Sequence, residues 1–486
     1  MLPGDFPDPS VSKWGRTYWA TATSSNWAPA FPLLKSTDLR TWELVGHVFP
    51  GEPPAWADYY FWAPEISFDR GQAYVYYTAH RRGGALCVAA ARADRPEGPY
   101  TDLGPLVEQP AGSIDGFAVR DEHGRLYLVW KEDGNSRNQP TPIWAQPLRE
   151  DRTGLLDRPV ELFRNDQPWE GNLVEGVSIV RRAGYFYAFY AGNGCCGRNC
   201  TYGLGVARAR SLLGPWEKYP HNPVLRSTDA WKCPGHGTAV EHGGRWFLLH
   251  HAYRARGWEY VGRQGVLSEF RWSAAGWPEF GPETTAAAPA LAAPTRWRDD
   301  FRGARLNPAW QWPVLARPRV ALRGGRLHLT ARPDGGGAAL GRSIAAADFT
   351  ATTTLLNPQL LPAGTSAGLA VLGDTDNALA LTAGGGALRL WQRQKGRLRT
   401  LAETALPATN AALTLRLQVV QGKECHAAWS TDGGRTWQPL ATAEATDGSF
   451  LPPWDRGVRA GLLALGLASV TASFEDFALE NQFDTP

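Results

Sequence analysis

The feature that most constrains this chain is a weak repeat of strand patterns in roughly its first 280 residues. Three segments share a charged start, a Leu or Gly-Pro turn, an aromatic residue and an apolar strand. They are LKSTDLRTWELVGHVF (34–49), ARADRPEGPYTDLGPLV (91–107) and ARARSLLGPWEKYPHNPVL (207–225). Their spacing fits a period of about 58 residues, hence five units. Repeated four-stranded units of this size are typical of β-propellers, so the sequence predicts a five-bladed β-propeller.

Other segments of the same region also have strand patterns. They are short, β-branched or aromatic, and bounded by Gly or charged turns: QAYVYYTAH (72–80), RLYLVWKE (125–132), YFYAFYAG (185–192) and RWFLLHHAY (245–253). No stretch sustains the period of an amphipathic helix. The sequence therefore predicts an all-β fold class.

A change in composition divides the chain. ETTAAAPALAAPT (283–295) is rich in Ala, Pro and Thr and has no core pattern, which is typical of a linker. Alternating strands with Gly-rich turns follow it, as in GGRLHLTAR (324–332). We predict a propeller catalytic domain over 1–282, a linker over 283–296 and a β-sandwich of the jelly-roll kind over 297–486.

Charge and hydropathy exclude several classes of partner. The 50 basic and 47 acidic residues give a net charge of +3 and form no basic block, so we expect no nucleic-acid partner. No run approaches the roughly 20 apolar residues of a membrane span. The opening MLPGDFPDPS does not have a signal-peptide pattern, and we expect Met1 to be a start residue added to a trimmed mature protein. The 22 tryptophans suit a carbohydrate-binding protein, although we expect most of them in cores.

Four of the six cysteines fall in GNGCCGRNC (192–200) and WKCPGHG (231–237). We interpret them as disulfides that staple two loops of an exported protein. The alternative is a zinc site, which the spacing disfavours because it lacks paired C-x-x-C motifs. Adjacent Cys195 and Cys196 leave a strained bridge between neighbours open, and the pairing is not readable from the sequence.

Three carboxylates lie at the starts of apolar strands. Asp8 lies in FPDPSV, Asp115 in SIDGFAV and Glu175 in VEGVSIV. Taken singly, Asp-Pro and Asp-Gly are ordinary turn formers, and a Glu at a strand end is usually solvated. The three fall in the first, third and fourth predicted repeats, however, and equivalent strand starts of a propeller converge on one axis. We therefore expect them to meet in one cavity.

The segments FPDPSV, WAPEIS (62–67), SIDGF, VEGVSIV and GHGTAV (235–240), in this order and spacing, resemble glycoside hydrolase family 43. The resemblance covers roughly residues 3–280. It implies a five-bladed propeller and an inverting hydrolase of glycans that contain arabinose, xylose or galactose. WRDDF (297–301) and the strands after it resemble the concanavalin-like sandwich that often follows such a propeller.

The resemblance also implies catalytic roles. Asp8 matches the general base, Asp115 the acid that tunes and orients the proton donor, and Glu175 the general acid. The family often has proline after the Glu-Gly pair, where this chain has Val177. An inverting enzyme needs one ionised carboxylate and one protonated carboxyl. We expect apolar neighbours and the charge of Asp115 to raise the pKa of Glu175, and Asp8 to stay ionised.

Three further residues are candidates for substrate binding. Trp62 is predicted either to form a stacking wall for a sugar or to fill the core of a blade. Arg263 is predicted either to hydrogen-bond a sugar hydroxyl or to form a salt bridge. His236 matches a family histidine near the propeller axis that contacts a water-coordinated ion, often calcium. We expect no cofactor in the chemistry itself, and calcium near His236 through waters.

Alternatives for function stay open. The favoured prediction is an exo-acting hydrolase of the α-L-arabinofuranosidase, β-xylosidase or β-galactofuranosidase type, secreted or periplasmic and monomeric, with an oligosaccharide or polysaccharide as substrate. The others are an endo-acting arabinanase and a non-catalytic carbohydrate-binding propeller. STDGGRTW (430–437) resembles the Asp-box of sialidases, which we interpret as a hairpin device in the sandwich.

Overall fold

The computed structural model describes residues 2–255, 258–281, 296–407, 412–440 and 445–483. The chain divides into two compact units. Unit 1 contains Met1–Ala255 and Arg263–Ala288, and unit 2 contains Arg256–Gly262 and Pro289–Pro486. Residues 256–262, which the sequence placed in the propeller, thus group with the second unit. The predicted linker, residues 283–296, lies outside the described residues except for its last residue.

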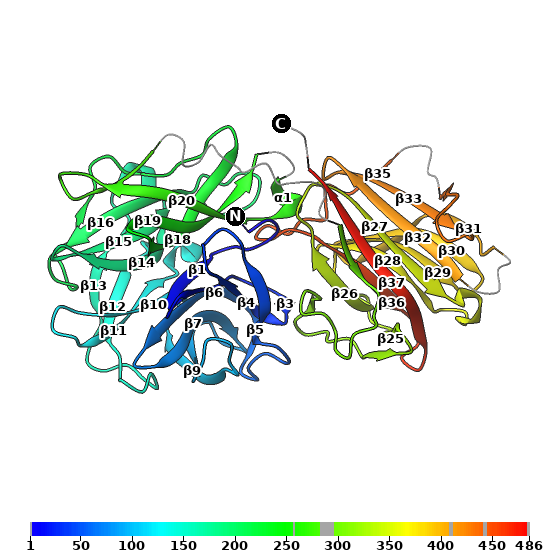
Figure 1. The fold of residues 1–486 in the computed structure, drawn as a ribbon, viewed down its shortest axis with the longest axis horizontal. Coiled ribbons are helices and arrows are strands. Elements are labelled where there is room, and N and C mark those ends of the chain that lie inside the picture. Colours follow the sequence, from blue (N-terminus) through cyan, green and yellow to red (C-terminus); the bar gives the residue numbers. More distant parts are fainter. Residues whose placement is uncertain (1, 256–257, 282–295, 408–411, 441–444, 484–486) are drawn as a thin grey trace. The chain divides into compact units, whose positions relative to one another are not determined.

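Unit 1 consists of five four-stranded antiparallel sheets, each built from strands consecutive along the chain, apart from β3 (Trp27–Ala28), which lies outside them (Figure 1). The first two sheets contain β1 (Ser10–Trp14), β2 (Thr17–Thr21), β4 (Ala30–Ser36) and β5 (Glu43–Phe49), then β6 (Ala57–Asp69), β7 (Gln72–Arg81), β8 (Leu86–Ala93) and β9 (Thr101–Glu108).

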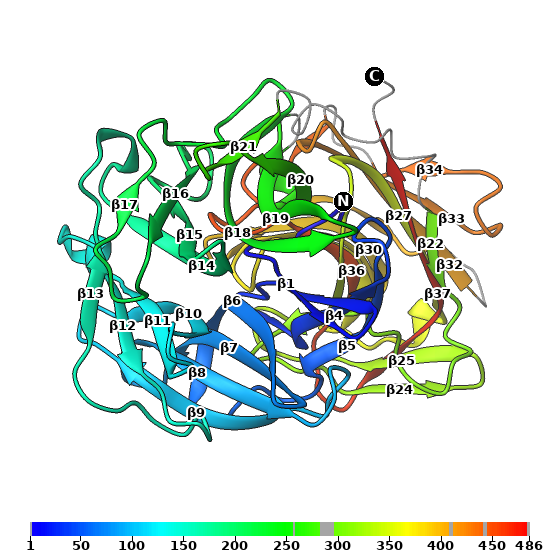
Figure 2. The ribbon, with the colours of Figure 1, turned by 60° about the vertical axis from the view of Figure 1, so that its left-hand side comes forward.

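The third sheet contains β10 (Ser113–Arg120), β11 (Leu126–Glu132), β12 (Ile143–Pro147) and β13 (Val160–Phe163). The fourth contains β14 (Val174–Arg182), β15 (Tyr185–Gly192), β16 (Gly203–Ala209) and β17 (Glu217–Lys218), and the fifth β18 (Trp231–His242), β19 (Arg245–Arg254), β20 (Gln264–Trp272) and β21 (Pro278–Phe280). Two 3-10 helices, η1 (Gly134–Arg137) and η2 (Pro168–Glu170), lie in loops. Figure 2 shows β1, β6, β10, β14 and β18 around a common centre, with the fourth strands outside. The five-bladed propeller is confirmed.

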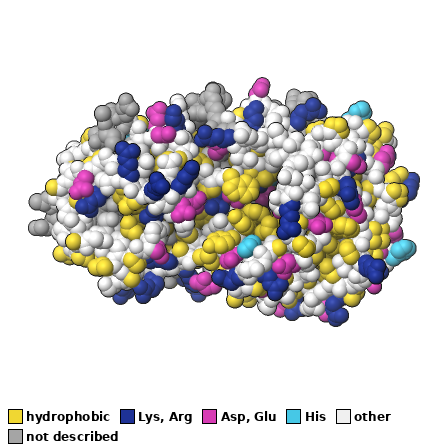
Figure 3. Space-filling model, turned by 180° about the vertical axis from the view of Figure 1, so that it is seen from behind, with side chains coloured by type: hydrophobic (Ala, Val, Ile, Leu, Met, Phe, Trp, Pro, Cys, Tyr) yellow, Lys and Arg dark blue, Asp and Glu magenta, His cyan; other side chains and the backbone are white. Residues whose placement is uncertain are grey.

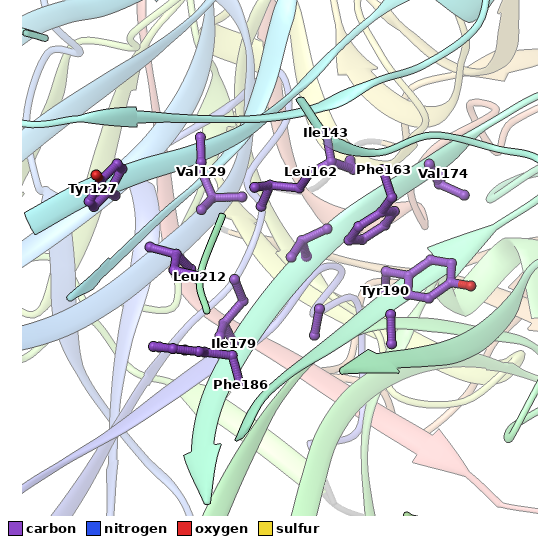
Figure 4. Packing of buried hydrophobic residues seen from close by; sticks show 14 residues of the cluster. Tyr127, Val129, Ile143, Leu162, Phe163, Val174, Ile179, Phe186, Tyr190 and Leu212 are labelled. Carbon is purple, nitrogen blue, oxygen red and sulfur yellow. The ribbon is translucent and has the colours of Figure 1, made fainter. Parts of the chain in front are cut away.

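The blades hold together by packing face on face. The second strand of a blade is buried on both sides, as in β15, where seven consecutive residues from Phe186 to Gly192 are buried. This explains why its sequence is apolar throughout rather than alternating. One cluster joins blades three and four (Figure 4), with Tyr127, Val129, Ile143, Leu162, Phe163, Val174, Ile179, Phe186, Tyr190 and Leu212 among its members.

The ring closes between its first and last blades. Leu2 forms backbone hydrogen bonds in both directions with Gly265, at 2.9 and 3.1 Å. The N–H of Phe6 donates to the carbonyl of Arg263 at 2.8 Å. An apolar cluster that includes Val11 and Leu249 fills the seam. The start of the chain is therefore held against β20.

Unit 2 is a pair of antiparallel sheets with nine and six strands. In β27 (Asp348–Leu356) buried and half-buried residues alternate, as expected for a strand with one face on a core. The larger sheet contains β22 (Arg296–Asp299), β24 (Val320–Arg323), β25 (Arg326–Thr330), β27 (Asp348–Leu356), β32 (Ala412–Val420), β33 (Glu424–Ser430), β34 (Gln438–Pro439), β35 (Thr446–Asp447) and β37 (Thr471–Gln482). The smaller contains β26 (Ala338–Ser343), β28 (Ser366–Leu372), β29 (Ala378–Gly384), β30 (Ala387–Gln394), β31 (Arg397–Ala405) and β36 (Arg459–Leu465).

The remaining elements of the second unit are short: α1 (Trp258–Val261), β23 (Trp312–Pro313) and η3 (Pro358–Leu360). The Asp-box segment forms the turn after β33, where Asp432 accepts hydrogen bonds from the backbone of Arg435 and Thr436 at 3.0 and 2.9 Å. This geometry matches the hairpin device that the sequence predicts.

The mixed surface charge and the absence of a long apolar helix among the described residues agree with the composition of the chain. On the face shown in Figure 3, acidic and basic side chains are interspersed. Among the described residues, no helix has both the length and the apolar character needed to cross a membrane.

Candidate active site

The site is built on one backbone feature that recurs in all five blades. At or just before the innermost strand, each blade has a residue with positive φ: Asp8 (48°), Ala63 (44°), Asp115 (59°), Gly176 (61°) and His236 (44°). In β6, β10, β14 and β18 this residue lies at a register shift in the pairing with the next strand. Such bulges re-aim side chains and are frequent beside active sites. They turn the ends of neighbouring inner strands toward one another.

Asp8 is buried among groups that favour its charged form. The Arg263 guanidinium donates to Oδ1 at 2.8 Å, and the Thr23 hydroxyl donates to Oδ2 at 2.7 Å. Nδ1 of His251 lies 3.1 Å from Oδ1. Burial alone would raise the pKa of Asp8, but Arg263 and the histidines hold it well below its usual range. The predicted ionised state of Asp8 agrees with this environment.

Asp115 lies one blade before Glu175 and contacts the segment that carries it. Its Oδ2 accepts a hydrogen bond from the Gly176 N–H at 2.8 Å. Nδ1 of His236 lies 4.0 Å from this Oδ2 and 3.7 Å from Oδ1 of Asp8. Burial, opposed by His236 and reinforced by the charge of Glu175, raises the pKa of Asp115 to about 6.

Glu175 has a hydrogen-bond donor on each carboxyl oxygen. The Tyr202 hydroxyl donates to Oε1 at 2.8 Å, and the Lys131 ammonium donates to Oε2 at 2.7 Å. Burial raises the pKa of Glu175, but the charge and hydrogen bond of Lys131, together with Tyr202, outweigh it and lower the pKa. The expectation of a raised pKa is therefore wrong, because it did not include a buried cation.

The other predicted residues lie as follows. Arg263 is only 4% exposed and forms the salt bridge with Asp8, which was one of its two predicted alternatives. The Trp62 indole N–H donates to the Ser25 hydroxyl at 3.2 Å, and its ring lies 4.5 Å from the Tyr60 ring. Trp62 is half-buried, so part of its surface stays accessible. Contact of either side chain with a sugar stays a prediction.

A directly bound metal ion needs several His, Cys, Asp or Glu side chains close together. In the described part of the chain, no group of three or more His, Cys, Asp or Glu side chains is arranged to hold a metal ion. The described side chains therefore do not provide the set of ligands that a directly bound metal ion requires. A calcium ion that contacts His236 through waters stays a prediction.

The four clustered cysteines form two disulfides, Cys195–Cys196 and Cys200–Cys233. The disulfide interpretation is thus confirmed, including the bridge between neighbours, and the zinc alternative is wrong because these thiols are consumed. Cys87 and Cys425 are free and buried.

The sequence reading missed Lys131, Tyr202 and His251. A signal existed for the first, since a lysine within the apolar strand LYLVWKE is unlikely to be buried without partners; its side chain is 1% exposed. The doublet in LLHHAY was a weaker signal for His251. Nothing in TYGLG (201–205) distinguishes Tyr202 from a core tyrosine.

Comparison with known proteins agrees with this geometry. Residues 1–278 match the model of glycosyl hydrolases family 43, and residues 298–480 match the beta xylosidase C-terminal concanavalin A-like domain. The crystal structure of a xylan beta-1,4-xylosidase from Bacillus halodurans superposes with a TM-score of 0.83 at 22% identity and covers 99% of both chains. At that identity the likeness supports the fold alone.

Two curated relatives carry names of activities. A xylosidase/arabinosidase from Butyrivibrio fibrisolvens is 28% identical over 58% of this chain and 56% of its own length. A non-reducing end alpha-L-arabinofuranosidase from Bacteroides ovatus is 25% identical over 72% of this chain and 69% of its own length. The chain spans 66% of the length of a relative from Escherichia coli. Because the family model covers more than half of the chain, the chain belongs to glycosyl hydrolases family 43.

Proposed function

We propose that this protein is an inverting, exo-acting glycoside hydrolase that releases xylose or arabinofuranose from the non-reducing ends of glycans. The proposal rests on one observation. Acidic side chains from three blades lie near one another, but in two different electrostatic environments. Asp8 is paired with a guanidinium, whereas Asp115 and Glu175 share a buried region with the Lys131 ammonium. A purely sugar-binding propeller does not need this division.

Asp8 is assigned as general base. Its salt bridge with Arg263 keeps it ionised at neutral pH, so it can accept a proton from a water molecule that attacks the anomeric carbon. The same bond fixes the carboxylate in one orientation. Inversion requires this water to lie between the base and the sugar, opposite the leaving group.

Glu175 is assigned as general acid and Asp115 as the residue that orients it. By accepting the Gly176 N–H, Asp115 fixes the backbone next to the proton donor. Burial and the charge of Glu175 raise the pKa of Asp115 to about 6, so this buried region can take up a proton in mildly acidic solution. Glu175 must carry that proton when the glycosidic oxygen leaves.

The sugar class follows from the names of the relatives, which include xylosidase/arabinosidase and non-reducing end alpha-L-arabinofuranosidase. A second candidate is endo-action on arabinan, because an extracellular endo-alpha-(1->5)-L-arabinanase from Bacillus subtilis is 24% identical over 56% of this chain. Release of single sugars from polymer supports exo-action, and release of longer oligosaccharides supports endo-action.

The test is a screen of wild type, Glu175→Gln and Asp8→Asn against 4-nitrophenyl β-D-xylopyranoside, α-L-arabinofuranoside and β-D-galactofuranoside, with xylo- and arabino-oligosaccharides. We expect wild type to cleave one of these classes. Both variants should lose at least about 10²-fold on the oligosaccharides. Proton NMR of the first product should show the inverted anomer. Sugar binding without turnover by wild type overturns the proposal.

We further propose that the protein is exported and monomeric. Two disulfides near the site favour an oxidising compartment. Fractionation of the native host tests the first statement, and sedimentation of the purified chain tests the second. For the proposed water-coordinated calcium near His236, thermal unfolding with calcium and with a chelator should differ by a measurable shift in Tm.

A further inference from the structure

The loop between β15 and β16 carries Cys195, Cys196 and Cys200, three of the four disulfide cysteines, and leads directly to the site. It is closed at its base by the Thr201 N–H, which donates to the Gly194 carbonyl at 2.9 Å, and by the Thr201 hydroxyl, which donates to Asn193 at 2.7 Å. The next residue, Tyr202, precedes the first residue of β16. Its hydroxyl donates to Glu175 on β14, the innermost strand of the same blade.

Tyr202 is held from several sides. Its ring stacks on the His251 imidazole, with centroids 5.6 Å apart and planes 7° from parallel. On β18 it rests on Gly235, where an added Cβ would lie 2.2 Å from the ring. The side chain is fully buried. Because His251 also contacts Asp8, the Tyr202–His251 stack connects the surroundings of the proposed acid with those of the proposed base.

The Cys200–Cys233 disulfide ties together the two segments that make this arrangement. Cys200 lies two residues before Tyr202, and Cys233 lies two residues before Gly235. The bridge therefore fixes the segment that carries the phenol to the strand on which its ring rests. The Cys195–Cys196 bridge joins neighbours within the loop tip and fixes no second strand.

We propose that Tyr202 is a positioning residue for the proton donor Glu175, and that the Cys200–Cys233 disulfide holds Tyr202 in place, so that proton donation depends on the redox state of this bridge. The inference rests on the proposed function, since it requires Glu175 to act as the acid. With Lys131 on Oε2, the Tyr202 hydroxyl fixes the second oxygen and stabilises the carboxylate.

Tyr202→Phe is the first test, since it keeps the ring and its stacking and removes only the hydroxyl. Loss of a hydrogen bond to the charged form raises the pKa of Glu175. The alkaline limb of kcat/KM should move up by about 1 pH unit. On substrates with poor leaving groups kcat/KM should fall about tenfold, and it should fall less on 2,4-dinitrophenyl glycosides, which need little protonation.

The disulfide is tested by Cys200→Ser/Cys233→Ser, with Cys195→Ser/Cys196→Ser as the matched control from the same loop. We expect the first pair to move the alkaline limb as Tyr202→Phe does, with no further movement when all three substitutions are combined. The control pair should keep the wild-type profile. In the Cys195→Ser/Cys196→Ser background, dithiothreitol should move the alkaline limb in the same way. It transfers two electrons and two protons to Cys200–Cys233 and becomes a cyclic disulfide.

The outcomes separate this inference from the proposed function. The pH profiles all use a glycoside that wild type cleaves and Glu175→Gln does not. Absence of such a glycoside defeats the catalytic assignment itself. If Glu175→Gln is inactive while Tyr202→Phe keeps the wild-type pH profile, only the inference fails. A shift in the control pair equal to that of Cys200→Ser/Cys233→Ser also overturns it, because the effect then belongs to the loop as a whole.

Discussion

At the scale of single residues, the Lys131 ammonium is the largest influence that lowers the pKa of Glu175. The ammonium is paired with Glu175 at 2.7 Å and with Asp133 at 2.9 Å, and its own pKa is raised. Lys131→Met removes the charge, so the pKa of Glu175 should rise. We expect the alkaline limb of kcat/KM to move up by about 1 pH unit or more, as measured in pH–rate profiles.

Lys131→Arg is the matched control because it keeps the positive charge. It should keep the limb close to that of wild type if it folds, which thermal unfolding will show. A limb that is unmoved or moves to lower pH in Lys131→Met contradicts the assigned role of this ammonium.

Glu65 gives a second prediction at this scale, on stability rather than on turnover. Its carboxyl accepts a hydrogen bond from Thr238 at 3.3 Å, and burial raises its pKa to about 8 from an ordinary value near 4.5. Between these two values the folded protein binds more protons than the unfolded chain, so stability is lost as pH rises. Glu65→Gln removes this loss.

We expect Glu65→Gln to raise Tm relative to wild type at pH 8 by about 2 °C, and to leave it near the wild-type value at pH 4.5. Part of the residue is accessible, which limits the effect. Calorimetry at both pH values measures it. An equal change in Tm at the two pH values would instead indicate a packing effect independent of charge.

At the scale of elements, the bulge in β14 should be intolerant of a side chain. Gly176 has φ +61°, and an added Cβ would lie 2.8 Å from Nδ1 of His236. Gly176→Ala therefore strains the backbone and displaces a ring that lies between Asp8 and Asp115. We expect a loss of about 1–3 kcal/mol in stability and at least tenfold in kcat/KM.

Gly184, at φ +77° in the next turn, has no atom within 4 Å of an added Cβ and serves as the control. Gly184→Ala should cost stability through its backbone alone and leave kcat/KM unchanged. Equal losses of activity in both variants would remove the steric explanation. Urea titration and steady-state kinetics give the two quantities.

The elements also show what sequence reasoning can and cannot reach. The strands and their order could be predicted because alternating and aromatic runs between turns indicate, from the local sequence alone, which residues are buried. The meeting of Asp8, Asp115 and Glu175 could be predicted because the period places all three at the starts of inner strands, although Glu175 lies one residue before the position equivalent to Asp8 and Asp115. The partner of Glu175 could not, because Lys131 lies 44 residues earlier and reaches the site from a different blade. The apolar strand around Lys131 indicates that this lysine has a partner, but nothing local indicates which residue of another blade that partner is.

At the scale of the whole propeller, closure between the first and last blades should be as strong as any other seam. Leu249 lies in the cluster at this seam, and its neighbour Leu248 points to the seam between blades four and five. Both side chains are fully buried. We expect Leu249→Ala and Leu248→Ala each to lower the free energy of unfolding by about 2–5 kcal/mol.

Chemical denaturation of the two variants makes the comparison. Similar costs indicate a ring whose seams are equivalent. A much smaller cost for Leu249→Ala would show that the closing seam opens before the rest of the propeller unfolds.

The five positive-φ positions show how the side chains of the site can be exchanged one at a time. The five blades repeat one backbone conformation, and its positions hold Asp, Ala, Asp, Gly and His. Because the backbone adopts this conformation with different side chains, a substitution can change the chemistry of one blade while the other four keep their structure. Ala63 and Gly176 lack a functional side chain, and Gly176 has no room for one, since an added Cβ would lie 2.8 Å from Nδ1 of His236. Ala63 is therefore the position at which an engineer can add a functional group without redesigning the fold.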